Sequence, residues 1–247
     1  MTNTSASVPS KGKGNNTSDP YDELNRLVGL IAVKKEIMKK KALVEGGLQL
    51  DPGHYVFMGN PGTGKTEVAR LMGMILKNLG LLKSGHIVIV SRNDLESDFV
   101  GGTAKNTAEM LDKAKGGILF VDEAYWMTDP NSRSNYGKET YDLIMQRMED
   151  DRHEFTVIFS GYKDKMEQFL FSNPGLKARI TSVLCFPDYT EAELYQILLL
   201  MASERNYILD APHTEAARII IHFWLLRKDK HFGNAREVID LLDKWME

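Results

Sequence analysis

The stretch "HYVFMGNPGTGKTEVAR", residues 54–70, decides the fold. An apolar run leads into three glycines and a lysine, and residues at helical spacing follow. Gly59, Gly64, Lys65 and Thr66 fit the pattern G-x-x-x-x-G-K-[ST] of a phosphate-binding loop. A tight turn would also use glycines, but the full spacing favours a loop whose successive backbone N–H groups point inward around a phosphate.

The residue types in this loop predict how a nucleotide is held. The helix that follows adds its positive N-terminal end. Lys65 can reach the terminal phosphates, and the Thr66 hydroxyl can ligate Mg²⁺. The predicted nucleotide-binding segment consists of Gly59, Asn60, Pro61, Gly62, Thr63, Gly64, Lys65, Thr66 and Glu67.

A second acidic element follows in "GGILFVDEAY", residues 116–125. Asp122 and Glu123 come directly after an apolar strand, at the strand end where α/β folds bind ligands. Asp122 is predicted to hold Mg²⁺, and Glu123 to polarise a water for attack on the γ-phosphate. The alternative is a helix start with acidic residues in its first turn. No Asn-Lys-x-Asp element of a GTPase is present, so the sequence favours ATP hydrolysis with ATP and Mg²⁺ as cofactors.

Apolar runs alternate with helical stretches along most of the chain. Strands are predicted at 54–59, 86–91, 117–123, 156–161 and 183–188, and a helix from Lys65 to Leu79. Near-continuous apolar character is typical of parallel strands covered on both faces. Strands alternating with helices predict a doubly wound parallel α/β sheet. Residues 21–45 also show helical spacing, with a lysine-rich face interpreted as solvated.

The pattern changes after Pro187. Helical stretches near 190–206, 212–227 and 233–246 follow with no strand between them. We therefore expect an α/β nucleotide-binding domain over residues 21–188 and a small all-helical domain over residues 189–247. Residues 1–20 are rich in Ser, Thr, Asn and Gly and cannot bury enough apolar surface to offset the entropy of ordering. They are predicted to be a disordered tail.

Composition limits the partners. A net charge of −3 at pH 7 gives no reason to expect nucleic acid or an anionic membrane surface, and no apolar stretch is long enough to span a bilayer. The single cysteine, Cys185, suits a reducing compartment, and its apolar neighbours predict a buried thiol. We expect a cytoplasmic protein; the Ser-rich tail leaves the plastid stroma as the alternative.

Three further residues are candidates for function. Arg236 lies at the start of the last helical stretch and reaches a γ-phosphate only if the helical domain folds over the site. Arg179 precedes the last strand, and the alternative for both arginines is a surface ion pair. Phe99 stands beside two glycines in a predicted loop, where an exposed aromatic residue is suited to gripping a partner. The alternative for Phe99 is a core contact.

Taken together, the chain resembles AAA+ ATPases, and among them the CbbX/CfxQ group, which includes red-type Rubisco activases and the stage V sporulation protein K proteins. The likeness runs from about Tyr21 to Glu247. It rests on the strings "GNPGTGKT", "DFVGGTAKNT", "GGILFVDEAY", "YGKET", "IFSGYKDKM", "SNPGLKARI", "FPDYTEAEL" and "NAR".

The resemblance implies a hexameric ring, homo- or hetero-oligomeric, with ATP at the subunit boundaries. It implies that Arg179 acts as an arginine finger on a neighbour's nucleotide and Arg236 as the sensor-2 arginine. It makes Phe99, Val100 and Gly101 a substrate-gripping pore loop and residues 128–137 a second one. Val28 and Gly29 are similar to the segment that lines the adenine pocket.

The implied function is ATP-driven remodelling of a protein substrate through the hexamer pore, a chaperone-like activity, with red-type Rubisco as the sharpest target. The alternative function is an ATPase of the same family that acts in another assembly, sporulation or secretion system. A DNA-acting AAA+ protein is a further, less favoured alternative. The sequence departs from the family at Phe99, where a tyrosine is usual. Tyr162 stands where a polar sensor-1 residue is expected, and we assign it no role.

Overall fold

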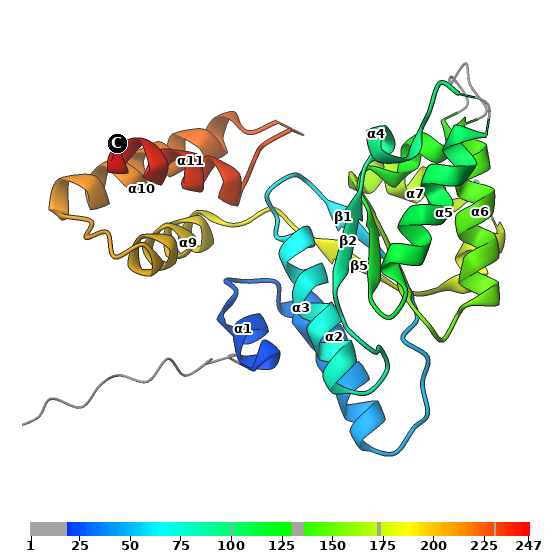
Figure 1. Ribbon diagram of the computed structural model, residues 1–247. Helices are drawn as coiled ribbons and strands as arrows, with labels where there is room; N and C mark the ends of the chain where they lie inside the picture. The colour runs from blue at the N-terminus through cyan, green and yellow to red at the C-terminus, as the bar shows by residue number, and fades with distance from the viewer. Residues whose placement is uncertain (1–18, 100, 130–135, 172–173, 230) are drawn as a thin grey trace, which may run out of the picture.

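The computed structural model describes residues 19–99, 101–129, 136–171, 174–229 and 231–247. Five parallel strands form one sheet in the order β2-β3-β4-β1-β5 (Figure 1). They are β1 (His54–Gly59), β2 (Ile87–Val90), β3 (Ile118–Val121), β4 (Thr156–Gly161) and β5 (Ile180–Phe186). The predicted doubly wound α/β fold is confirmed, and β5 begins three residues before the predicted strand.

Helices cover both faces of the sheet because alternate residues of the central strands point to opposite sides. In β1, Tyr55 and Phe57 join a core with α2 (Ile31–Glu45) and α3 (Lys65–Asn78). Val56 and Met58 join a second core with α5 (Gly102–Ala114), α6 (Tyr136–Asp150) and α7 (Lys163–Phe171). Every residue of β1, β3 and β4 is buried, so the apolar runs predicted these strands correctly.

The edge strands are less covered than the sequence predicts. Ile89 of β2 and Val183 of β5 are each 42% exposed. Cys185 is exposed as well, so the prediction of a buried thiol is wrong. In β5 the buried residues Leu184 and Phe186 alternate with outward-facing ones, because an edge strand packs one face on the core and leaves the other open.

The N-terminal helical pattern is interrupted. It forms α1 (Pro20–Arg26) and α2, separated by Gly29 with φ of 63° and Leu30 with φ of 55°. A left-handed backbone at two successive residues ends one helix and redirects the chain. The turn brings residues 27–30 towards the phosphate-binding loop.

Short helices complete the α/β part, and three longer ones follow the last strand. The short ones are α4 (Arg92–Leu95), η1 (Ala124–Thr128) and α8 (Pro174–Arg179). The longer ones are α9 (Glu191–Glu204), α10 (Ala211–Arg227) and α11 (Ala235–Met246), and they lie to one side of the sheet (Figure 1). The division into domains at Asp188 stays a prediction. None of the described helices is long and apolar enough to cross a membrane.

Candidate functional site

The phosphate-binding loop lies between the end of β1 and the start of α3. Gly62 and Gly64 have φ of 68° and 89°, left-handed values that favour glycine. At Gly59, an added Cβ would stand 2.3 Å from the Phe186 carbonyl oxygen. The glycines are therefore required by the backbone itself, independently of any ligand.

Lys65 lies over this loop at the first position of α3. Its ammonium donates to the carbonyl oxygens of Gly59, at 2.8 Å, and Asn60, at 2.7 Å. Burial lowers the pKa of Lys65 to about 8, with Arg236 adding to the decrease and Asp122 opposing it. Lys65, Asp122 and Arg236 are therefore close enough to influence one another's charge.

The acidic pair follows β3 as predicted. The Asp122 backbone N–H donates to the Val90 carbonyl at 2.9 Å, and one Asp122 carboxylate oxygen accepts the Glu123 N–H at 3.0 Å. Glu123 has φ of 51°, a strained value for a residue with a side chain and one that is common at functional sites. The Glu123 carboxylate is exposed and contributes to raising the pKa of the neighbouring Tyr125 hydroxyl, after burial.

One cavity of about 800 Å³ joins these elements. Its polar end is formed by the loop, the acidic pair and Arg236, whereas its apolar end is formed by residues from the α1–α2 turn and from α9. The predicted residues that line it are Val28, Gly59, Pro61, Gly62, Gly64, Lys65, Thr66, Glu67, Asp122, Glu123 and Arg236. The volume suits a nucleotide, because ligand pockets of roughly 300–1,000 Å³ are typical.

Three predicted nucleotide-binding residues do not line this cavity. The Asn60 side chain donates to Asp188 at 2.9 Å, and the Thr63 hydroxyl donates to the Asn60 carbonyl at 2.8 Å. Gly29 packs against α9, where an added Cβ would stand 2.4 Å from Glu193 Oε1. These residues shape the loop and its surroundings.

Several residues that line the site were given no role by the sequence. Tyr162 follows β4 and Tyr189 follows β5, and both line the cavity together with Leu27, Ile197, Leu200 and Met201. The Tyr189 hydroxyl donates to the Thr63 carbonyl at 3.3 Å. The positions of the two tyrosines after parallel strands were a usable signal. The α9 residues gave none, because they read as one face of an ordinary amphipathic helix.

A buried asparagine joins the phosphate-binding loop to the C-terminal helices. Asn234 is fully buried, and its side chain accepts from the Tyr189 N–H at 3.0 Å and donates to Asp188 at 2.9 Å and to Pro61 O at 3.3 Å. Next to it, a Cβ on Gly62 would stand 1.9 Å from the Gly233 carbonyl oxygen. This contact fixes the first turn of α11, and with it Arg236, against the loop.

Arg179 lies at the opposite end of the sheet. It is the last residue of α8 and immediately precedes β5, whereas Gly59 pairs with Phe186, the last residue of β5. A strand of this length spans about 20 Å, further than an arginine side chain reaches. Its guanidinium donates to Gly175 O at 3.0 Å and pairs with Glu149 at 3.1 Å.

Phe99 is 82% exposed, which excludes the core alternative. It lies between α4 and α5, where its carbonyl accepts the Gly102 N–H at 2.9 Å and Gly101 caps α5 with φ of 74°. Val100 lies outside the described residues, as do residues 130–135 of the predicted second pore loop and most of the predicted tail.

Comparisons with known proteins agree with this geometry. A model of the ATPase family associated with various cellular activities (AAA) matches residues 55–223. Protein CbbX of Cereibacter sphaeroides is 39% identical over 251 residues, which cover 98% of this chain and 81% of that protein. The protein named ribulose bisphosphate carboxylase/oxygenase activase, chloroplastic, of Cyanidioschyzon merolae is 42% identical over 234 residues, 90% of this chain and 79% of that protein. The CfxQ homologue of Guillardia theta is 42% identical, with the same coverage.

Solved structures support the fold alone. The Thermotoga maritima RuvB Holliday junction branch migration motor matches with a TM-score of 0.61 and 23% identity, over 88% of this chain and 62% of that one. Hsp104 with ATPγS and casein matches with a TM-score of 0.60 and 15% identity, over 92% and 44%.

Proposed function

The chain belongs to the AAA family of ATPases and, within it, to the CbbX/CfxQ group, and from this premise we propose that a hexameric ring of it remodels a protein substrate. The chain binds nucleotide and is an ATPase. The proposal concerns how its residues share the hydrolysis of ATP, how neighbouring subunits cooperate, and what the ring acts on.

We assign the catalytic roles to three residues of the nucleotide cavity. Lys65 pairs with the terminal phosphates, Glu123 takes a proton from the attacking water, and Arg236 contacts the γ-phosphate. What supports these roles is that Lys65, Glu123 and Arg236 line one cavity, and that lysine and arginine form charge-assisted hydrogen bonds to phosphate. The apolar end, which includes Val28, receives the adenine.

The donor set fits Mg²⁺. The Thr66 hydroxyl and the Asp122 carboxylate are hard oxygen ligands in the same cavity. Within the described ranges no group of three His, Cys, Asp or Glu side chains is placed to hold a metal. Mg²⁺ is typically held by one or two protein oxygens together with phosphate and water, and Thr66 and Asp122 could provide those protein oxygens. When bound, Mg²⁺ neutralises charge that develops on the phosphates.

The position of Arg179 carries the proposal that subunits act on one another. Arg179 is too far from the phosphate-binding loop of its own chain, being separated from it by the length of β5. In a ring, an arginine finger contacts the nucleotide of the neighbouring subunit. The distance of Arg179 from its own phosphate-binding loop is consistent with that role. Phe99, exposed on the loop before α5, is the proposed contact with the substrate in the pore.

Rubisco is the proposed substrate, supported by the name of the Cyanidioschyzon merolae relative. The test is to add the protein and ATP to red-type Rubisco that carries a bound inhibitory sugar phosphate, and to follow carboxylation. We expect activity to return with wild type and not with Glu123→Gln. An active ATPase that fails to restore carboxylation would exclude Rubisco and leave the remodelling proposal to be tested on proteins that copurify with Glu123→Gln.

A further inference from the structure

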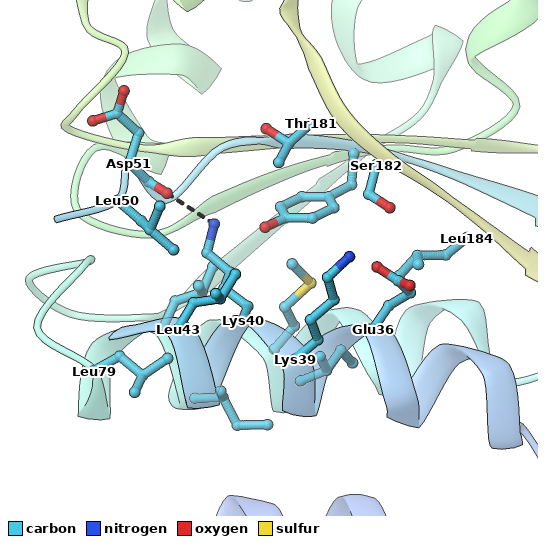
Figure 2. Close-up of a pocket in the computed structure, with 15 residues that line it drawn as sticks. Glu36, Lys39, Lys40, Leu43, Leu50, Asp51, Leu79, Thr181, Ser182 and Leu184 are labelled. Carbon is cyan, nitrogen blue, oxygen red and sulfur yellow. Dashed lines mark hydrogen bonds between the residues drawn. The ribbon is translucent and has the colours of Figure 1, made fainter. Parts of the chain in front are cut away.

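A second cavity of about 290 Å³ lies between α2, α3 and the start of β5. Figure 2 shows it roofed by the sheet and floored by the helices. Its lining includes Leu79, which follows the last turn of α3, and Tyr55, near the start of β1. The phosphate-binding loop joins the other ends of these two elements, so the two cavities lie at opposite ends of α3 and β1. Of the described residues, none lines both this cavity and the nucleotide cavity.

The walls of this cavity are predominantly apolar. They are formed by Ile37, Leu43, Leu50, Tyr55, Met72, Ile75, Leu76, Leu79 and Leu184. Met72, Ile75 and Leu76 are almost fully buried. Protein interiors are normally close-packed, and apolar cavities bind compact apolar molecules. The volume is near the lower limit for small-molecule pockets, roughly 300 Å³, so the ligand must be small.

Lys40 provides a cation at one side of the cavity. Its ammonium donates to the carbonyl oxygens of Asp51, at 2.8 Å, and Pro52, at 2.9 Å, and lies 5.6 Å from the centre of the Tyr55 ring. One of its three N–H groups therefore has no hydrogen-bond acceptor among the described residues and can serve a ligand. Burial lowers the pKa of Lys40 to about 8, and a ligand anion beside it would raise that pKa again. The Asp51 carboxylate pairs with His153 and points away in Figure 2, but its charge still acts on Lys40 and opposes the decrease of the Lys40 pKa.

Lys39 provides a second cation. It is exposed on α2, and among the described residues none accepts a hydrogen bond from its ammonium. Glu36 lies one turn earlier on the same helix, and Figure 2 shows its carboxylate beside Lys39. Lys39 and Lys40 therefore lie close to two carboxylates, Glu36 at the mouth and Asp51 beyond Lys40. With two carboxylates already beside the two lysines, the site can accept at most a single negative charge and disfavours a polyphosphate.

We propose that this cavity binds a small molecule with a compact apolar body and a single carboxylate. The apolar body occupies the well between Met72, Ile75 and Leu184. The carboxylate lies at the mouth, where it accepts hydrogen bonds from Lys39 and from the remaining N–H of Lys40. A neutral apolar molecule would leave the remaining N–H of Lys40 without an acceptor, and a small hydrophilic carboxylate such as acetate would leave the well unfilled.

The test uses octanoate as the probe and the full chain labelled with ¹³C at its methionine methyl groups. Met72 lies in the cavity wall, and Met72→Leu assigns its NMR signal. We expect octanoate to shift this signal with a dissociation constant of about 1 mM or tighter. Octanol should bind about fivefold or more weakly, since it lacks the charge, and acetate should leave the signal unmoved at the same concentrations.

Two variants and one control locate the site. Lys39→Ala should weaken octanoate binding about fivefold, whereas Lys35→Ala, an exposed lysine of the same helix that does not line the cavity, should not change it. Leu43→Trp fills the mouth from a position that is 37% exposed, and it should abolish the shift while ATPase activity is retained. The proposal is overturned if octanoate leaves Met72 unmoved, if octanol binds equally well, or if Leu43→Trp binds like wild type.

Discussion

At the scale of single residues, Lys65 connects burial to nucleotide affinity. Its ammonium is surrounded by loop carbonyls, and burial lowers its pKa to about 8. The free protein therefore loses this charge as the pH rises through 8. The phosphates of ATP favour the charged form, so binding above that pH must be accompanied by uptake of a proton.

We predict that ATP affinity falls as the pH rises from about 8 to about 10, by up to tenfold per unit. The measurement is a fluorescent-ATP titration across this range. Lys65→Met should bind weakly at every pH, without the decline. An equal slope in the two proteins would show that Lys65 is not the titrating group.

Glu123 is the proposed general base, and its substitution separates binding from hydrolysis. Glu123→Gln keeps the size of the side chain and the Mg²⁺ ligands but cannot accept the proton. We predict turnover at least about 100-fold slower with ATP affinity close to wild type, measured by phosphate release and by titration. Glu109→Gln, an exposed acidic residue on α5, serves as the control. A wild-type rate in Glu123→Gln would exclude it as the base.

The sequence predicts the site residues that lie close together along the chain, and it does not predict those that are brought together from distant segments. Lys65, Thr66 and the acidic pair were found because their chemistry is encoded in short spacings. Tyr189 and Asn234 were missed, because their bonds join residues 126 and 45 positions apart. No local pattern marks an asparagine that is buried by distant segments.

At the scale of elements, the buried strands were predictable and the edges were not. An apolar run predicts a strand, but it does not show whether that strand lies in the middle or at the edge of the sheet. The edge position of β5, and with it the exposure of Cys185, was therefore not predicted. The break between α1 and α2 was also missed, since apolar residues continue at helical spacing through Leu27 and Leu30. Only the left-handed backbone at Gly29 and Leu30 reveals it.

The junction between α11 and the phosphate-binding loop leads to a prediction about Asn234. Asn234→Gly removes the buried hydrogen bonds but tolerates the positive φ of 50°. We predict a loss of about 2 kcal/mol in the free energy of unfolding and ATP binding weakened about tenfold, because Arg236 is no longer fixed against the loop. Urea unfolding and ATP titration measure the two effects.

Asn206→Gly is the matched control. Asn206 also has a left-handed φ, of 55°, but is exposed at the end of α9, so the same substitution should leave ATP binding unchanged. If Asn234→Gly unfolds more easily yet binds ATP normally, the asparagine stabilises the helices without positioning Arg236.

At the scale of the whole molecule, the distance between Arg179 and the phosphate-binding loop predicts complementation between subunits. Arg179→Ala should bind ATP and hydrolyse it on the order of a thousandfold more slowly. Lys65→Ala should be inactive as well. In mixed rings, some interfaces pair an intact loop with an intact arginine, and part of the ATPase activity should return. Mixed rings that assemble without regaining activity would contradict a shared site.

The exposed loop before α5 predicts where the ring grips its substrate. Phe99→Ala removes a large, rigid apolar contact without touching the nucleotide cavity. We predict normal basal ATPase activity and ring formation, with loss of remodelling and of any substrate-stimulated ATPase. Ile208→Ala, at a site 88% exposed, should keep both. Wild-type remodelling by Phe99→Ala would remove the support for a gripping role.

The central place of β1 in the sheet has a consequence for the newly made chain. β1 is synthesised early, but both of its neighbours, β4 and β5, come from residues 156–186, and the asparagine that locks the loop is residue 234. At about 5–20 residues per second, a ribosome needs roughly 10–35 s to pass from Gly59 to Asn234. For the first part of that interval, until β4 has been made, β1 has no strand to pair with, although it is buried on both faces in the finished protein. The nucleotide site is therefore completed long after its phosphate-binding loop has been made, and a nascent chain gains ATP as a stabilising ligand only once Asn234 has been synthesised.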